Sequence, residues 1–478
     1  MPEQQIVEPR LLRGFRDYLP GQMIARQRII ATIRSVYERY GFRPLDTPAL
    51  EFRATLMGYG DENTKQIFEF QNPEEEHVAL RFDLTVPLAR VVAQYPDLPL
   101  PFKRYQVGPV WRADKPDPGR FREFTQFDID SVGVSSLAAD VEILCAMHDT
   151  FIGLGVQRFR IRFSSRKVLD TLLDFAGIPH GMAHGVFRVL DKLEKIGLDG
   201  VSAELTAGRV DASGDKIPGL GLQQAQVAKI RDFVDLPKGT RSEVLANLTR
   251  LFAGVPSSAA AIGDLTFLNT SLASLGMSDD FVALDLSIAR GLDYYTGSVF
   301  EAMLTDAPEF GSVFGGGRYD GLVERFLGKS IPAVGGSIGV DRLLAALSKA
   351  GSLQDSSATA RVLVLVMERD RMPEYLAIAQ EIRKAGINTE VYVGEEKSLR
   401  KQLQYADRLG IPVGVIIGGD EFAHNTVTLK DLKQGAQLQE KKSTAPGVER
   451  EKWLEKSRSV QRTVPREQMI REITAMLA

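Results

Sequence analysis

The segment Arg290–Gly297 (RGLDYYTG) brings a guanidinium group, a carboxylate and two phenols together on one short stretch. It follows the mostly apolar run Phe281–Ala289, which we expect to be a strand. Glycine near each end permits a tight turn and a close approach of the backbone to a ligand. Buried tyrosine hydroxyls need hydrogen-bond partners, so a Tyr pair beside an Arg indicates a pocket with polar walls. The alternative is a polar turn after a strand.

A second candidate lies on the strand expected over Arg122–Val132. Because side chains alternate along a strand, one face carries an aromatic ring, an amide and two carboxyl groups. These residues are Phe124, Gln126, Asp128 and Asp130. Such a face borders a polar cavity or, alternatively, is the solvated side of an antiparallel sheet.

Cations surround the same strand. The strand expected before it, Phe102–Arg112, ends in Arg112, and the connecting loop supplies Lys115 and Arg120. Guanidinium groups bind phosphate oxygens in a paired geometry, so several cations around a strand hairpin suit a polyphosphate.

The segment Val78–Thr85 is expected to form a further strand, with Arg81, Asp83 and Thr85 on one side. An Asp and a Thr there can bind an ammonium group, and the alternative is again a solvated strand. The glycines of Gly315–Gly317 and of Gly335–Arg342 allow a ligand to approach the backbone, although tight packing turns use glycine in the same way.

No phosphate-binding loop of a familiar kind is present. The sequence contains neither Gly-x-x-x-x-Gly-Lys-Ser/Thr nor a Gly-x-Gly-x-x-Gly turn after a strand. If the protein uses a nucleotide, we expect an antiparallel scaffold whose arginines hold the phosphates.

Composition narrows the class of protein. The 478 residues, 44% of them hydrophobic and 25% charged, predict two or three globular domains. The net charge of −3 gives no sign of general nucleic-acid coating. No run of about 18 apolar residues predicts a membrane span. The single cysteine, Cys145, and the scattered histidines lead us to expect no protein-held metal and a reducing cytoplasm.

The elements that must position these residues follow from periodicity. In the first part we expect a helix over Gln22–Tyr40, an extended segment over Phe42–Glu51 and a helix over Leu137–Phe151. A mostly helical insertion is expected over about 155–276, and strands return over Phe281–Leu304 and Gly311–Gly317 before a helix at Gly339–Leu347. These elements predict an α+β domain over residues 1–350.

Residues 351–360 are expected to be a linker, and 361–478 a small α/β domain with a largely parallel sheet. Its expected elements alternate, as strands Arg361–Met367, Thr389–Val393 and Val413–Ile417 and helices Pro373–Ala385 and Leu399–Leu409. The charged stretch 440–462 is expected to be an exposed, dispensable insertion, followed by a last strand and helix over Val464–Leu477.

Taken together, these segments resemble histidyl-tRNA synthetases, which are class II aminoacyl-tRNA synthetases. The stretch Arg13–Pro20 resembles the N-terminal signature of that family, and 22–51, 102–133 and 332–347 resemble the three class II motifs. Arg290–Gly297 and Gly315–Gly321 resemble the two signatures peculiar to the histidine enzymes. Residues 361–429 resemble the anticodon-binding domain shared by several class II synthetases.

The resemblance implies a class II catalytic domain on an antiparallel sheet, a C-terminal anticodon-binding domain, and roles for individual residues. It implies that Asp83, Thr85 and Gln126 hold the substrate α-amino group, that Asp130 and Tyr295 grip the imidazole nitrogens, and that Tyr294 lines that pocket. It implies that Arg112 contacts the α-phosphate and carboxylate, that Arg120, Phe124 and Arg342 hold ATP, and that Arg290 stabilises the transferring phosphate. Asp83 and Asp130 stand where many bacterial relatives have Glu.

The activity implied is formation of histidyl-adenylate from L-histidine and ATP, with Mg²⁺ on the pyrophosphate oxygens, followed by transfer to tRNA(His). The resemblance also implies a cytoplasmic homodimer with no membrane association and no editing domain. One alternative is the non-catalytic regulatory subunit of ATP phosphoribosyltransferase, which typically lacks the anticodon domain and an intact 290–297 signature. The other is a sensor of uncharged tRNA, against which the set Arg112, Arg290 and Arg342 argues.

Overall fold

The computed structural model describes residues 7–57, 67–116, 119–211, 214–288, 294–351, 358–433 and 460–478. The chain divides into two compact units: the first unit comprises residues 1–16 and 28–352, and the second unit residues 17–27 and 353–478. Most of the expected linker lies outside the described residues, which resume at Ala358.

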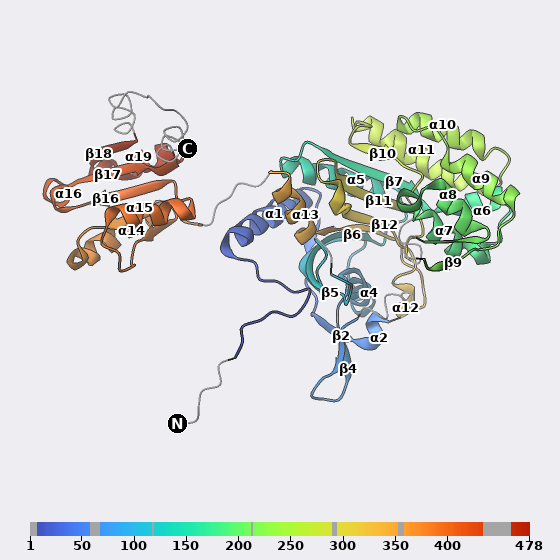
Figure 1. Cartoon of the computed structure of the whole chain (residues 1–478), viewed down its shortest axis with the longest axis horizontal. Helices are drawn as coiled ribbons and strands as arrows, with labels where there is room; N and C mark the ends of the chain where they lie inside the picture. The colour runs from blue at the N-terminus through green and yellow to red at the C-terminus, as the bar shows by residue number, and fades with distance from the viewer. Residues whose placement is uncertain are drawn as a thin grey trace. The chain divides into compact units, whose positions relative to one another are not determined.

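A sheet of eight strands forms the centre of the first unit, in the order β1-β5-β6-β13-β12-β11-β7-β10 (Figure 1). From β5 to β7 every neighbouring pair is antiparallel, whereas the edge strands β1 and β10 run parallel to β5 and β7. The expected antiparallel scaffold is therefore confirmed at its centre, and the whole sheet is mixed. The strands are β1 (Arg43–Pro44), β5 (Phe102–Trp111), β6 (Glu123–Val132), β7 (Phe159–Ser165), β10 (Val282–Leu284), β11 (Ser298–Leu304), β12 (Ser312–Arg318) and β13 (Ala333–Gly339).

One face of this sheet is apolar. Phe127 of β6 is fully buried there, and its ring lies edge-on to that of Tyr37, with 5.1 Å between centroids. The helices that pack on this face are α1 (Pro20–Arg39), α5 (Ala138–Gly153) and α13 (Val340–Lys349), and all three agree with the helices expected from the sequence. The residues that alternate with Phe127 point to the other face and are available for a site.

A smaller sheet lies beside the first, in the order β2-β4-β3, next to the short helix α2 (Arg53–Leu56). Its strands are β2 (Leu50–Phe52), β4 (His77–Leu80) and β3 (Glu69–Gln71). The strand expected over 78–85 is wrong beyond Leu80, because α4 (Thr85–Gln94) begins at Thr85. The Asp83 carboxylate accepts the Val86 N–H at 3.0 Å, and this capping bond, with Pro87 in the first helical turn, outweighs the strand-like alternation.

Two other expectations also need correction. Strand β10 stops at Leu284 and does not continue to residue 289, because the Asp285 carboxylate accepts hydrogen bonds from both the N–H (3.0 Å) and the hydroxyl (2.6 Å) of Ser287. Such a bond pattern turns the chain. The helical insertion begins later than residue 155, because residues 159–165 form β7 inside the large sheet.

The insertion itself is helical, as expected, and lies at the β7–β10 end of the sheet (Figure 1). Its helices are α6 (Arg166–Ala176), α7 (Ala183–Leu190), α8 (Leu193–Leu205), α9 (Gln224–Val234), α10 (Arg241–Leu251) and α11 (Ser258–Ser274). A two-stranded sheet, β8 (Gly208–Val210) with β9 (Lys216–Pro218), completes it.

The second unit has a five-stranded sheet in the order β15-β14-β16-β17-β18. Strands β14, β15 and β16 are parallel, as expected, but β17 and β18 are antiparallel additions, and β17 was not expected from the sequence. The strands are β14 (Val362–Val366), β15 (Thr389–Val391), β16 (Val413–Ile417), β17 (Thr426–Asp431) and β18 (Gln461–Pro465). The charged stretch 440–462 lies outside the described residues up to 459, and its last residues enter β18.

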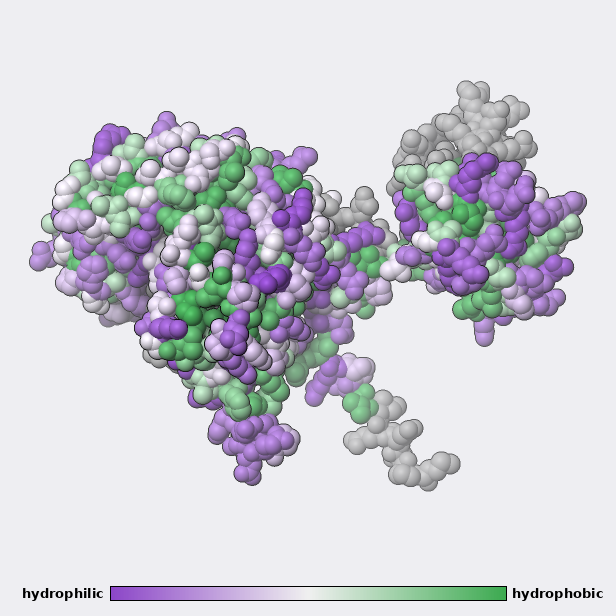
Figure 2. Space-filling view, turned by 180° about the vertical axis from the view of Figure 1, so that it is seen from behind, coloured by the Kyte–Doolittle hydropathy of each residue, from purple (hydrophilic) through white to green (hydrophobic). Residues whose placement is uncertain are grey.

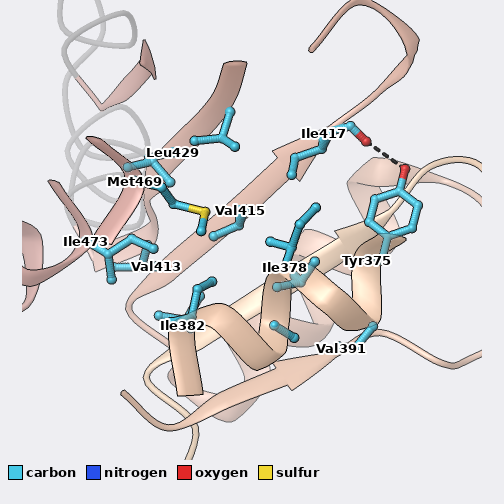
Figure 3. Close-up of a cluster of buried hydrophobic side chains, with 14 of the residues drawn as sticks. Tyr375, Ile378, Ile382, Val391, Val413, Val415, Ile417, Leu429, Met469 and Ile473 are labelled. Carbon is cyan, nitrogen blue, oxygen red and sulfur yellow. Dashed lines mark hydrogen bonds between the residues drawn. The ribbon is translucent and has the colours of Figure 1, made fainter. Parts of the chain in front are cut away.

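Aliphatic side chains fill both faces of this second sheet. In β14 the valines at 362, 364 and 366 face α14 (Met372–Lys384) and α19 (Met469–Leu477), and the leucines at 363 and 365 face α15 (Leu399–Leu409). Figure 3 shows the α14 side of this core, where the Tyr375 hydroxyl donates a hydrogen bond to the Ile417 carbonyl at 2.7 Å. No helix in the described part of the chain is long and apolar enough to cross a membrane.

Candidate active site

The polar face of β6 is the floor of the candidate site. Gln126, Asp128 and Asp130 are all less than 10% exposed on this face. The neighbouring strand β13 places Gly335 opposite Asp130, and a β-carbon at Gly335 would lie 2.0 Å from the Asp130 Oδ1. On β12, a β-carbon at Gly317 would lie 2.8 Å from the Tyr295 ring. Glycine is therefore required at both positions because a carboxylate and an aromatic ring occupy the space of a side chain.

Asp130 is held by two partners at the buried end of the floor. Arg104 of β5, which is fully buried, places its Nη2 2.8 Å from the Asp130 Oδ2, and the Tyr319 hydroxyl donates a hydrogen bond to the Oδ1. Burial raises the pKa of Asp130, while Arg104 and the Tyr319 hydroxyl oppose that rise. The Arg104 Nη2 also donates to the Leu84 carbonyl at 3.1 Å, which ties this end to the chain before α4.

Asp83 and Thr85 approach the floor from that same turn. Burial raises the pKa of Asp83 to about 6, and the Val86 N–H and the Arg112 guanidinium act in the opposite direction. Thr85 is the first residue of α4, so its side chain stands at the start of a helix and not on a strand. Asp83 is thus poised to accept a cation near neutral pH.

Three phenols stand together above the glycines. The Tyr294 and Tyr295 rings are edge-on with 5.3 Å between centroids, and the Tyr294 ring lies 5.4 Å from that of Tyr319. The Tyr294 hydroxyl is buried without a hydrogen-bond partner among the described residues. Burial, together with the nearby Asp83 carboxylate, raises the Tyr294 pKa well above its ordinary value, so the phenol stays neutral.

An open cavity of about 470 Å³ extends from Gln126 and Tyr295 toward the start of α13. Six residues expected from the sequence line it: Arg112, Arg120, Phe124, Gln126, Tyr295 and Arg342. The other expected residues within the described part, Asp83, Thr85, Asp130 and Tyr294, lie outside its lining. They are linked to it through the Asp83–Arg112 attraction and the Tyr294–Tyr295 ring contact.

The arginines of this cavity are anchored by oxygen atoms of the protein. The Arg112 Nε donates to the Phe82 carbonyl at 3.0 Å, and its guanidinium carbon lies 5.2 Å from the centre of the Phe124 ring. The Arg342 Nη1 donates to the Ser312 carbonyl at 2.8 Å. Arg120 is exposed and forms an ion pair of 2.5 Å with Asp114. Anchored guanidinium groups around a hollow form a preorganised anion site.

Two further arginines bear on the expected site, Arg290 and Arg104. Arg290 lies outside the described residues, so its expected position near the phosphate stays a prediction. Arg104 was missed from the sequence, although a signal existed: it is the strand partner of Asp130 in the β5–β6 hairpin. An Arg opposite an Asp in a long, otherwise buried hairpin indicates a buried ion pair.

Known proteins show the same organisation. A family model described as histidyl-tRNA synthetase matches residues 14–343, and one described as an anticodon binding domain matches residues 360–451. The histidine–tRNA ligases of Ruegeria sp. (strain TM1040) and Rhizobium leguminosarum bv. trifolii (strain WSM2304) are each 42% identical to the chain. They align with 100% and 99% of this chain and with 97% and 96% of their own lengths.

Solved structures agree with these relatives. The histidyl-tRNA synthetase from Nostoc sp. PCC 7120 superposes with a TM-score of 0.82 at 34% identity and covers 98% of this chain and 100% of its own. The ATP phosphoribosyltransferase regulatory subunit/histidyl-tRNA synthetase from Bacillus halodurans C has a TM-score of 0.68 at 22% identity, covering 83% of this chain and 97% of its own, which shows a shared fold. The regulatory-subunit alternative is not favoured, because ligases match the chain nearly from end to end.

Proposed function

The chain belongs to the histidyl-tRNA synthetase family and is a histidine–tRNA ligase, and from this premise we propose how its residues divide the reaction. Its substrates are histidine, ATP and tRNA. The site has two ends: a buried acidic end, which binds histidine, and an open cavity lined with arginine, which binds ATP.

At the histidine end, Asp83, Thr85 and Gln126 hold the α-amino group. The supporting observation is that the Gln126 Oε1 is buried without a hydrogen-bond partner among the described residues. An unpaired buried acceptor costs free energy until a donor arrives, and an ammonium group supplies three donors. Thr85 adds a hydroxyl at the start of α4, close to the Asp83 carboxylate that caps the helix.

Asp130 and Tyr295 grip the two imidazole nitrogens, and Tyr294 closes the pocket. A site that hydrogen-bonds both ring nitrogens leaves its own buried groups unpaired when an apolar analogue binds. That penalty supplies discrimination of about 10⁴–10⁵ without an editing domain. The anchoring of Asp130 by Arg104 and Tyr319 fixes the carboxylate before the substrate arrives.

At the ATP end, Arg112 contacts the α-phosphate and the histidine carboxylate, and Phe124 stacks on the adenine. Arg342 and Arg120 hold the outer phosphates, and Arg290, which lies outside the described residues, adds a second charge at the α-phosphate. The histidine carboxylate attacks the α-phosphorus, a P–O bond to pyrophosphate breaks, and negative charge grows on the phosphoryl oxygens. Fixed guanidinium groups stabilise that charge, which is the main catalytic contribution.

Mg²⁺ enters as part of the ATP substrate, on the pyrophosphate oxygens. The carboxyl groups that line the cavity already have partners: Asp114 pairs with Arg120, and the Asp341 Oδ2 accepts the Thr125 N–H. Phosphate oxygens and water, and not these side chains, are therefore the ligands that the ion finds here.

The protein acts as a homodimer. Large apolar side chains are exposed around the small sheet, including Leu50 (42%), Phe52 (56%), Phe70 (48%) and Tyr95 (54%). Figure 2 shows hydrophobic surface on the first unit, directly above the hydrophilic tip of the β3–β4 hairpin. Leu50, Phe52 and Tyr95 also border a hollow of about 600 Å³. Light scattering of the purified chain tests this assembly, and a monomer at micromolar concentration would refute it.

The second unit contacts the anticodon of tRNA(His), and the insertion contacts its acceptor stem. The reaction takes place in the cytoplasm, where a chain whose one cysteine is buried needs no oxidising conditions. The charged stretch predicted over 440–462 is dispensable up to residue 459, before β18, and removal of 440–459 is expected to leave tRNA charging intact.

Exchange of pyrophosphate into ATP with each of the twenty amino acids tests the assignment of residues. We expect exchange with histidine alone, strongly reduced in Arg290→Ala and in Arg112→Ala. Exchange that survives both changes would contradict the mechanism based on arginine, while the family membership would stand.

A further inference from the structure

One carboxyl group on the floor of the site has no role in the mechanism above. Asp128 lies between Gln126 and Asp130 on the same face of β6 and is only 2% exposed. Its Oδ1 has no hydrogen-bond partner among the described residues. Its Oδ2 lies 3.9 Å from the Arg104 Nη2, too far for a direct hydrogen bond, because that nitrogen is engaged at 2.8 Å with Asp130.

The charges around Asp128 do not balance. Asp83, Asp128 and Asp130 supply three carboxyl groups, and Arg104 and Arg112 face them with two guanidinium groups. A third guanidinium group, that of buried Arg81, also attracts Asp128, but its close contacts are with other groups: it binds the Thr47 carbonyl at 2.5 Å and has Asp46 at 3.9 Å. The strand partners of Asp128 on its two sides, Ser337 of β13 and Gln106 of β5, are neutral, so Asp128 has no counter-charge in direct contact among the described residues.

A buried carboxyl group without a counter-charge keeps its proton. Burial raises the pKa of Asp128 to about 7, against the opposing effect of Arg104 and with a further rise from Asp130. Asp128, and not Asp130, is the group left without a close cation, since Arg104 forms its 2.8 Å ion pair with Asp130. Histidine brings a positive ammonium group to the neighbouring Gln126 and Asp83, while its own carboxylate lies toward Arg112, so the end of the site next to Asp128 gains a cation.

We propose that Asp128 is a further histidine-binding residue, which is protonated in the free enzyme and releases that proton to solvent when the α-ammonium group of histidine enters the pocket. The resulting carboxylate then supports the ammonium from the floor of the site, next to Gln126. This inference rests on the proposed histidine end of the site.

Calorimetry of L-histidine binding to the full chain at about pH 7, in buffers of different ionisation enthalpy, measures the released protons. The comparison is between wild type and Asp128→Asn, which keeps the shape and removes the charge. We expect about half a proton less to be released by the variant, because the pKa of Asp128 lies at about 7. Ring protons lost by free histidine contribute equally to both proteins and cancel.

The kinetic readout is the KM for histidine, which we expect to rise at least about tenfold in Asp128→Asn while the KM for ATP stays within about twofold. Ser337→Ala is the matched control. It removes the polar group facing Asp128 and should keep the proton release, whereas loss of the release would mean that Asp128 acts only through Ser337. Unchanged KM and unchanged release in Asp128→Asn would make Asp128 a structural buried acid and overturn the proposal.

Asp83→Asn separates this inference from the proposed function. If Asp83→Asn weakens histidine binding and Asp128→Asn does not, only the inference fails, whereas two variants with normal binding would contradict the histidine end as a whole. If the Asp128→Asn variant does not fold, the proton release measured with the wild-type protein is the test of the proposal. That release must exceed the fraction of free histidine that carries a ring proton at that pH, and an equal or smaller release overturns the proposal.

Discussion

The large sheet of the first unit carries glycine and buried charge in its central strands, whereas the sheet of the second unit is aliphatic on both faces. In β13 and β12 the glycines Gly335 and Gly317 clear space over a floor that holds Asp128 and Asp130. In β14 and β16 every position except Gly414 is taken by buried valine, leucine or isoleucine. The first sheet gives up apolar burial to form a binding surface, and the second keeps its full core.

This difference predicts how substitutions in the core of each unit affect catalysis and stability. Substitutions in the centre of the first sheet affect chemistry and stability together, because the side chains that bind substrate are also buried. In the second unit the core affects stability alone, so its tRNA contacts must be made by surface residues.

The largest effect is expected from an arginine of the first unit. Arg112→Ala should lower kcat for ATP–pyrophosphate exchange by about 10²–10³, because a fixed donor at the developing phosphoryl charge is lost. The matched control is Arg383→Ala in the second unit, whose guanidinium also donates to a backbone carbonyl, that of Thr389, at 2.8 Å. Exchange rates for both variants are the measurement, and equal losses would remove the contrast between the units.

Glycine substitutions come next. Gly335→Ala places a β-carbon 2.0 Å from the Asp130 Oδ1 and 2.5 Å from the Ile129 carbonyl oxygen, so the backbone must shift. We expect about 3 kcal/mol less stability and weaker histidine binding. Gly414→Ala, in β16, meets the ends of leucine side chains, with Leu365 nearest at 3.2 Å, and should cost less than about 1 kcal/mol. Denaturant unfolding of both variants checks the contrast, which similar losses would break.

A dependence on pH should be confined to the first unit's acidic end. Because burial raises the pKa of Asp83 to about 6, its carboxylate is present above that pH and is lost as the pH falls through it. The KM for histidine should therefore rise about tenfold per pH unit well below pH 6. In Asp83→Asn this component should vanish, leaving the titrations of Asp128 and of histidine itself. Parallel profiles for the two enzymes would exclude Asp83 as the group responsible.

The smallest effect is expected in the second unit. The Tyr375 hydroxyl donates to the Ile417 carbonyl and accepts the N–H groups of Met367 and Glu368 at 3.2 and 3.3 Å. Tyr375→Phe should lower the free energy of unfolding of this unit by about 1 kcal/mol. Pyrophosphate exchange with histidine should not change. A slower exchange would mean that the core of the second unit influences the active site.

The predictions from the sequence were correct where a single local pattern determined the structure. The β5–β6 hairpin, α15 and β16 follow from periodicity alone, and the arginines around the cavity follow from their position at the hairpin. They failed where a short polar interaction redirected the chain, as at Asp83, which caps α4, and at Asp285, which ends β10. Such bonds involve one side chain and leave no repeating pattern.

The partner of a buried charge was missed although the sequence held a signal for it. Arg104 and Asp130 lie on consecutive strands of one expected hairpin, but their pairing depends on the register of that hairpin, which the strand pattern alone does not fix. The acidic face of β6 could be predicted from the alternation of side chains. Whether that face is a solvated surface or the floor of a cavity depends on β13. Strand β13 lies about 200 residues further along the chain, as the pairing of Gly335 with Asp130 shows, and sequence patterns do not predict so distant a pairing.

The parallel pairing of β7 with β10 has a consequence for the history of this chain. Strand β7 ends at Ser165 and β10 begins at Val282, and the two lie side by side in the same direction. Any connection between them must travel back along the length of the sheet, which takes about a dozen residues or more. The helical insertion is therefore an enlarged version of a link that topology demands. As far as the sheet is concerned, the link could be lengthened, shortened or replaced by a foreign module that still spans the return path, and such a replacement would remove only the contacts proposed for the acceptor stem.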